Sequence, residues 1–172
     1  VIGKDAELFK QTIWNTMKLT GANCSPFEAW LVYQGMKTLP LRMDKHSSNA
    51  LLISTTLSNH PNVSRVNYPG LESHPDHFVA KKQMRAFGGM MSFELNGGID
   101  TAIKAMNKLR FCSLAPTLGD VDTLVLHPAT SSHLNVDKSS RDANGITDGL
   151  VRLSVGIEDV NDIIGDLDQA LA

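Results

Sequence analysis

The sequence predicts an α+β fold in which helices cover one side of a small, mainly antiparallel sheet. Helices come first in the order of predicted elements, and short strands interleaved with helices follow, which is typical of a single covered sheet. Residues 150–155 alternate as a strand, with apolar side chains at every second position. Residues 157–171 carry apolar side chains at helical spacing, so a helix follows this last strand.

The predicted helices are defined by apolar residues at helical spacing and by start and stop signals. Ser25 precedes Pro26, and Glu28 lies three residues after Ser25, as in a capping box. The helix that begins there is apolar nearly all round, so we expect it to be buried. The full set of predicted helices is 4–17, 26–36, 41–58, 74–84, 99–109 and 157–171.

Two of these helices are expected to turn charged side chains towards water. In the helix over 41–58 this outer face holds Arg42, Asp44, Lys45 and His46. In the last helix the outer face is acidic and consists of Glu158, Asp159, Asp162, Asp166 and Asp168. Acidic residues at a helix start also suit the helix dipole, so we interpret them as a solvated face and not as acid–base catalysts.

The predicted strands are short runs with period-two alternation, and residues such as Pro, Gly and Asn close them. They span residues 63–68, 90–95, 111–115, 123–126 and 150–155. The simplest organisation from pattern alone is one domain, whose first helices connect it to further sequence.

Composition narrows the function classes. The 172 residues carry 16 Lys+Arg and 18 Asp+Glu, which gives no electrostatic reason to expect nucleic acid or an anionic membrane as a partner. Two cysteines without a CxxC motif exclude a disulfide framework and favour a reducing, cytoplasmic compartment. No apolar run suits a membrane helix, and no histidine or cysteine pattern predicts a metal site. The start at Val1 is neither a signal peptide nor an initiator Met, so we expect a chain cut from a longer one.

Arg152 is the first candidate site residue. The two-residue period places Arg152 on one strand face with Leu150 and Ser154, opposite Val151 and Leu153. A guanidinium in so apolar a strand needs either an anionic partner or open water. A carboxylate would suit its planar fork, and the alternative is an ordinary arginine on a solvated strand face.

Thr117 is the second candidate. It lies in the segment 114–120, where a strand runs into proline, a hydroxyl and glycine, and loops at strand ends often meet ligands. Its hydroxyl and nearby backbone N–H groups are suited to an anion, and the alternative is an ordinary turn. From the residues alone, the sequence predicts a site but no reaction.

Several stretches, taken together, are similar to a known family. The segment 145–159 resembles the C-terminal signature of the Cys/Met-metabolism enzymes that depend on pyridoxal phosphate (PLP), which include cystathionine synthases and lyases, methionine γ-lyase and homoserine sulfhydrylases. The resemblance continues, in family order, through residues 20–31, 35–43, 68–75, 80–84, 87–95 and 127–133.

The resemblance implies roles for both candidates. Arg152 falls on the arginine that binds the substrate α-carboxylate, and Thr117 falls where the family usually has a serine that borders the cofactor and its lysine. No lysine of this sequence has the family's Ser-x-Thr-Lys setting. The resemblance therefore implies no catalytic residue in this chain, which would be inactive alone, and PLP bound mainly by upstream sequence. It implies that residues 1–40 end the cofactor domain and form connecting helices, and that 41–172 form the C-terminal substrate-binding domain of a fold-type I PLP enzyme.

The implied activity is γ- or β-elimination or replacement on a sulfur amino acid or activated homoserine, in a homo-oligomer, typically a tetramer. The segment 118–120 and the segment 127–129 are closer to methionine γ-lyases and homoserine sulfhydrylases, whereas Met17 and Lys18 depart from a Lys-Asp pair of many methionine γ-lyases. The alternative function is a non-catalytic α+β module that binds an acidic ligand or partner chain through Arg152.

Overall fold

The computed structural model describes residues 4–172, which form two compact units that divide after Leu39. The assignment of residues 1–40 to the end of a cofactor domain, and of 41–172 to a substrate-binding domain, stays a prediction.

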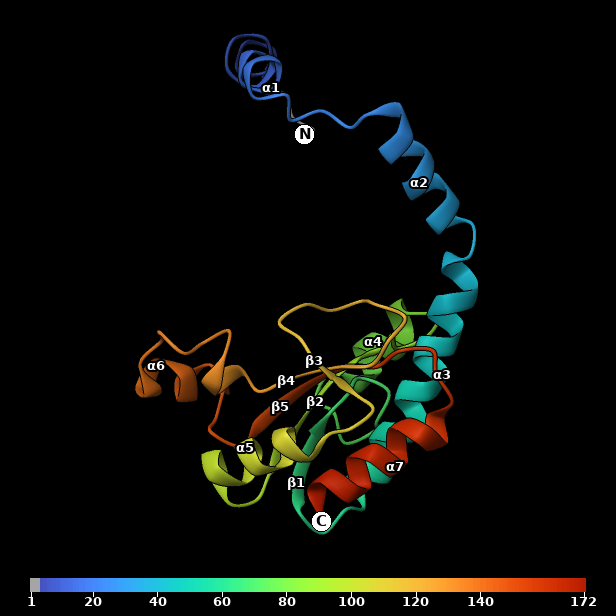
Figure 1. The fold of residues 1–172 in the computed structure, drawn as a ribbon, viewed down its shortest axis with the longest axis vertical. Helices are drawn as coiled ribbons and strands as arrows, with labels where there is room; N and C mark the ends of the chain where they lie inside the picture. Colours follow the sequence, from blue (N-terminus) through green and yellow to red (C-terminus); the bar gives the residue numbers. More distant parts are fainter. Residues whose placement is uncertain (1–3) are drawn as a thin grey trace. The chain divides into compact units, whose positions relative to one another are not determined.

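The first unit is helical. A π-helical stretch, η1 (Leu8–Ile13), runs directly into α1 (Trp14–Thr20), so the predicted helix extends further than residue 17. It ends at Gly21, whose φ of +66° lies in the left-handed region that glycine adopts without steric cost. The second helix, α2 (Pro26–Met36), has the predicted bounds (Figure 1).

The capping box of α2 is confirmed, but its burial is not. Ser25 accepts a hydrogen bond from the backbone N–H of Glu28, and the Glu28 carboxylate accepts one from the Ser25 N–H at 2.7 Å. No residue of α2 is buried, so the predicted burial is wrong. A helix that is apolar all round needs cover on every side, and the described residues of its own unit provide no such layer. The exposed large side chains are Phe27, Trp30, Leu31, Val32, Tyr33 and Met36.

The helices of the second unit mostly match the predicted ranges. They are α3 (Leu39–Ser58), α4 (His77–Gln83), α5 (Gly98–Lys108), α6 (Lys138–Ala143) and α7 (Val160–Leu171), with a 3₁₀ turn η2 (Pro128–Thr130). α4 begins later than predicted because His74 forms a turn, in which its Nδ1 accepts from the Asp76 N–H. The sequence reading missed α6, which Asp137 caps by accepting from the Ser140 N–H.

The sheet has five strands in the order β1-β2-β5-β4-β3. The strands are β1 (Val63–Asn67), β2 (Met90–Leu95), β3 (Ser113–Leu114), β4 (Leu124–Leu126) and β5 (Leu150–Ser154). Three neighbouring pairs are antiparallel, and only β3 and β4 run parallel. The predicted mainly antiparallel sheet is confirmed (Figure 1).

Helices α3, α5 and α7 cover one face of this sheet. Their apolar side chains pack on Phe93, Val151 and Leu153, which are fully buried. Helix residues of the same core include Ile53, Leu57, Ala102, Met106, Ile163 and Leu167. The α+β class with helices on one side of the sheet is therefore confirmed. Because side chains alternate along a strand, Arg152 and Ser154 point to the opposite face of β5.

The loop that joins the parallel strands β3 and β4 lies on that opposite face. Parallel strands need a connection that returns to the same end of the sheet, usually through a helix. Here residues 115–123 make the return without a helix. This segment, which we call the crossover loop, contacts the side chains of Arg152 and Ser154 on β5.

Three side chains that were expected to face water are instead packed, so these expectations are wrong. His46 is buried, and its Nδ1 lies 2.6 Å from the carbonyl oxygen of Val155. Asp166 is buried and accepts three backbone N–H groups of residues 110–112. Glu158 is half-buried and accepts the N–H and hydroxyl of Thr123. Asp166 and Glu158 accept from donors of a neighbouring segment, and His46 pairs with a carbonyl oxygen of one, which helical periodicity alone does not reveal.

Candidate functional site

Arg152 lies in the middle of the sheet, on the face opposite to α3, α5 and α7. In register across the strands it stands between Ser92 of β2 and Leu126 of β4, and Asn67 of β1 continues the row. Its Nη2 donates a hydrogen bond of 2.7 Å to the carbonyl oxygen of Thr117. Its Nε is buried and has no hydrogen-bond partner. A buried N–H without a partner costs free energy, so the guanidinium is ready for an acceptor that the described residues do not supply.

Thr117 is the residue of the crossover loop that meets Arg152. The structure therefore brings the two sequence-predicted residues together, although through the backbone carbonyl of Thr117 and not through its hydroxyl. The hydroxyl makes no hydrogen bond with any residue that the structure describes, and Thr117 is exposed. This hydroxyl is thus free to contact a ligand beside the guanidinium.

No carboxylate neutralises Arg152 among residues 4–172. The nearest acidic side chain along β2 belongs to Glu94, and both of its carboxylate oxygens already lie within 2.6 Å of the Thr147 hydroxyl. The ion pairs that the structure describes join Lys138 and Arg141 to aspartates elsewhere. A half-buried guanidinium without a counter-ion favours binding of an external anion.

Ser154 and Gly119 form a cluster with Arg152 and Thr117. Neither Ser154 nor Gly119 was predicted from the sequence as a site residue. The Gly119 N–H donates to the Ser154 hydroxyl at 2.9 Å. Gly119 has φ +84°, a conformation that suits glycine and allows the loop to turn at this point. The available signal was the strand period, which places Ser154 on the same face as Arg152.

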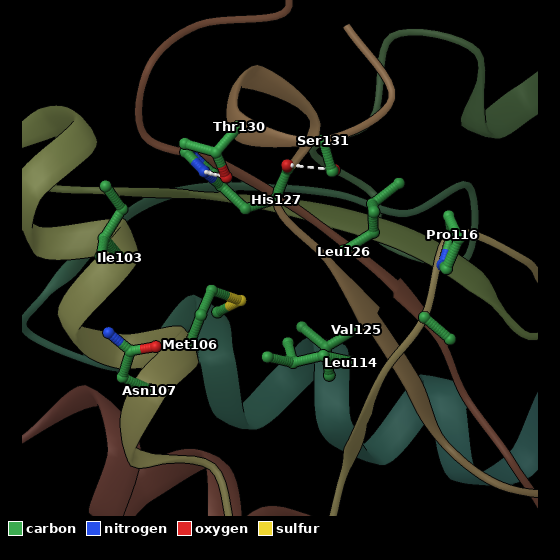
Figure 2. Close-up of a pocket in the computed structure, with 11 residues that line it drawn as sticks. Ile103, Met106, Asn107, Leu114, Pro116, Val125, Leu126, His127, Thr130 and Ser131 are labelled. Carbon is green, nitrogen blue, oxygen red and sulfur yellow. Dashed lines mark hydrogen bonds between the residues drawn. The ribbon is translucent and has the colours of Figure 1, made fainter. Parts of the chain in front are cut away.

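A cavity of about 320 Å³ lies at the β3 edge of the sheet, between α5, β3, β4 and η2. Figure 2 shows Ile103 and Met106 of α5 on one side and Leu114 and Val125 on the other. The cavity reaches the crossover loop at its beginning, through residues 115 and 116. Its lining is mostly apolar, so it suits hydrocarbon more than an ionic group.

His127 borders this cavity, and both of its ring nitrogens have hydrogen-bond partners within the fold. Its Nδ1 lies 2.8 Å from the Thr130 hydroxyl, and its Nε2 lies 2.9 Å from the carbonyl oxygen of Asp148 (Figure 2). A carbonyl oxygen only accepts, so Nε2 donates its N–H to Asp148. Both ring nitrogens are occupied, which gives His127 a role in orienting the turn.

Within residues 4–172, no group of three or more His, Cys, Asp or Glu side chains is arranged to hold a metal ion. In the same residues, no helix combines the length and apolar character needed to cross a bilayer.

The fold and the cluster define an α+β domain in which Arg152 lies beside the crossover loop, on the sheet face opposite to α3, α5 and α7, with no counter-ion among residues 4–172. The chain belongs to the Cys/Met metabolism PLP-dependent enzyme family, whose profile matches residues 1–172. The resemblance found in the sequence is thus confirmed.

Individual relatives support this membership. The chain is 52% identical over 153 residues to an L-methionine gamma-lyase of Fusobacterium nucleatum subsp. polymorphum, with 89% of this chain and 39% of the relative covered. It is 47% identical over 171 residues to an L-methionine gamma-lyase of Porphyromonas gingivalis, covering 99% of this chain and 43% of the relative. It is 43% identical over 171 residues to a cystathionine beta-lyase of Coxiella burnetii, covering 99% and 44%. The chain therefore spans about two fifths of the length of these relatives.

The family implies PLP, and the residues present fit one part of such a centre. The orphaned Nε of Arg152 suits the carboxylate of an amino acid, and the free hydroxyl of Thr117 suits a polar contact beside it. Among the described residues, the side-chain hydrogen bonds of this cluster join Arg152 to Thr117 and Ser154 to Gly119 and include no lysine, so this part fits the substrate side of the centre and not the attachment of the cofactor.

Proposed function

We propose that this chain supplies the substrate-carboxylate site of a PLP-dependent enzyme that acts on sulfur amino acids. The observation that carries the proposal is the half-buried guanidinium of Arg152, which has an unpartnered Nε and no counter-ion among the described residues. A carboxylate matches the planar fork of arginine and can accept two parallel hydrogen bonds.

In this proposal the residues of the chain bind and orient, and the cofactor supplies the electron sink for the reaction when it is bound. Arg152 holds the α-carboxylate and thereby fixes the direction of the Cα–H bond of the substrate. Of the described residues, Thr117 is the one that we assign to the cofactor side, because its hydroxyl is free and lies on the loop next to Arg152.

For the reaction we propose elimination at Cγ or Cβ with release of a thiol, with L-methionine as the first substrate to test. The support is the name of the relatives: L-methionine gamma-lyases stand at 52% and 47% identity, and a cystathionine beta-lyase at 43%. Activated homoserine is the second substrate class to test, since the family resemblance includes homoserine sulfhydrylases.

We also propose that the protein works as a homo-oligomer in the cytoplasm. The apolar side chains around α2 are exposed in its unit, which suits a helix that packs against another protein surface. Both cysteines are free, which suits a reducing compartment.

The test uses the polypeptide that carries these 172 residues, supplied with PLP, and measures thiol release from L-methionine. Arg152→Ala removes charge-assisted hydrogen bonds worth about 1.5–3 kcal/mol each, so we expect a rise in KM of roughly 100-fold. Arg65→Ala is the matched control, because Arg65 is exposed on the edge strand β1 and has no part in the cluster.

Equal KM values for Arg152→Ala and Arg65→Ala would remove Arg152 from the substrate site. A protein that releases no thiol from any sulfur amino acid, but whose Arg152→Ala variant loses affinity for simple carboxylates, would instead support the alternative of a non-catalytic binding module.

A further inference from the structure

The crossover loop is held at both ends by bonds that do not involve the candidate site. At its beginning, the Ala115 N–H donates to the Val125 carbonyl oxygen at 3.1 Å. At its end, the Ile157 N–H donates to the Val121 carbonyl oxygen at 2.8 Å. Glu158 adds a further anchor through Thr123. The two ends of the loop are thus fixed to β4 and to the turn after β5.

The middle of the loop depends on β5 side chains. Between residues 116 and 120, the hydrogen bonds to the rest of the described fold are Arg152 Nη2 to the Thr117 carbonyl and the Gly119 N–H to the Ser154 hydroxyl. Arg152 and Ser154 are two residues apart on one face of β5, and Thr117 and Gly119 are two residues apart on the loop. The loop therefore runs alongside β5, and each side chain holds one backbone group.

We propose that Ser154 is a positioning residue, which holds Gly119 so that the Thr117 carbonyl meets Arg152 and sets the direction of its guanidinium. This inference rests on the proposed function, because it assigns Ser154 to the same carboxylate site. Ser154 does not touch the substrate in this assignment, and its effect passes through the loop to Arg152.

Burial and chemistry support this role. Ser154 is only 3% exposed, so its hydroxyl is not generally available to water. A hydroxyl can accept from Gly119 and still donate, whereas an alanine methyl can do neither. Without this acceptor the loop keeps its end anchors, and only the segment around Thr117 gains freedom. A guanidinium whose carbonyl partner moves then samples more directions, and a substrate carboxylate must restrict them upon binding.

The test compares Ser154→Ala with the unaltered protein in the PLP-supplied polypeptide, using thiol release from L-methionine. We expect a rise in KM of about 5- to 20-fold with kcat within a factor of about two, because the lost interaction orients the binding group. Ser64→Ala is the matched control: Ser64 lies on β1, and its hydroxyl donates to the Glu94 carbonyl, away from the loop. If Ser154→Ala is unstable, Ser154→Cys keeps a similar volume with a much weaker acceptor and is expected to behave alike.

A double-mutant cycle separates positioning from general structure. If Ser154 acts through Arg152, Ser154→Ala causes no further rise in KM once Arg152→Ala is present. A full, additive effect in that background would overturn the inference. An unchanged KM for Ser154→Ala, beside a raised KM for Arg152→Ala, would overturn it as well and leave the proposed function standing. An unchanged KM for Arg152→Ala would instead refute the proposed function.

A measurement that needs no activity tests the hydrogen bond itself. Amide hydrogen exchange of Gly119 is expected to become at least tenfold faster in Ser154→Ala, while the amide of Val155, which donates to the Gly89 carbonyl, keeps its rate. Equal exchange of Gly119 in both proteins would show that Ser154 does not hold the loop, and would overturn the inference irrespective of the reaction.

Discussion

Replacing Asp166 by asparagine, which has nearly the same shape, is expected to destabilise this fold. Its Oδ1 accepts the Arg110 N–H at 2.9 Å, and its Oδ2 accepts those of Phe111 and Cys112 at 2.9 and 2.8 Å. Gln169 Nε2 also donates to Oδ1 at 3.0 Å. Asparagine has one carbonyl oxygen, so in Asp166→Asn at least one donor faces an amide NH₂ group. Losing charge-assisted bonds worth about 1.5–3 kcal/mol each predicts a loss of about 3 kcal/mol in the free energy of unfolding.

The assay is urea unfolding of the 172-residue chain, followed by far-UV circular dichroism. With an m-value of about 2 kcal/mol/M, the predicted loss lowers the midpoint by about 1.5 M. Asp168→Asn is the control, because Asp168 is exposed on the same helix and loses the same charge. We expect it to stay within about 0.5 kcal/mol of the unaltered chain. Equal midpoints for the two variants would refute the role assigned to Asp166.

The pH dependence gives a second check on Asp166. Burial works to raise its pKa, but hydrogen bonds from the backbone N–H groups of residues 110–112 and from Gln169 lower it, and the net result is a pKa below the ordinary 3.8. A carboxylate with a depressed folded-state pKa contributes stability that is fully present above its unfolded pKa and is lost as pH falls through the folded value. The gap between the unaltered chain and Asp166→Asn should thus stay constant from pH 7 to about 4 and shrink below that.

Gly156 and the thiols of Cys24 and Cys112 can be tested by substitution and by chemical modification. A Cβ atom on Gly156 would overlap the Glu158 carboxylate and the backbone of the crossover loop, so Gly156→Ala should destabilise the chain by more than about 3 kcal/mol. The control Gly165→Ala places its Cβ in open space on α7 and should stabilise by up to about 1 kcal/mol, as measured by thermal unfolding; similar effects of both changes would contradict the clash. Burial, with a smaller contribution from a neighbouring carboxylate, raises the pKa of Cys112, whereas Cys24 is exposed. A disulfide reagent at pH 8 should therefore modify Cys24 rapidly and Cys112 only upon unfolding, and rapid reaction of both thiols would contradict the burial of Cys112.

The sequence was sufficient for most of the regular elements. Alternation predicted β2 and β5 well, and the capping box placed the start of α2 at the observed residue. These signals are local, because they depend on spacing within one element. The missed α6 is short and polar, and its start depends on a single aspartate cap. Short elements of this kind carry no periodic signal to detect.

The charged and polar side chains that were wrongly expected to face water have partners that lie far away in the sequence. Asp166 was assigned to the solvated face of its helix, but the donors that it accepts lie more than fifty residues earlier. His46 likewise reaches a carbonyl oxygen 109 residues later. Helical spacing reports which face a residue occupies and says nothing about which segment covers that face. Ser154 was not predicted as a site residue for the same reason. Its partner Gly119 lies in the loop that connects the parallel strands β3 and β4.

The capping box of α2 has a consequence for how that helix meets another surface. Both of its cap hydrogen bonds lie within the first turn, between Ser25 and Glu28, so the helix can start without help from a partner. A helix that is already formed loses less backbone freedom upon docking than a segment that must fold there. The apolar side chains of α2 are thus presented on a preformed helix. Docking of α2 onto another protein surface would then need mainly the removal of water from these side chains.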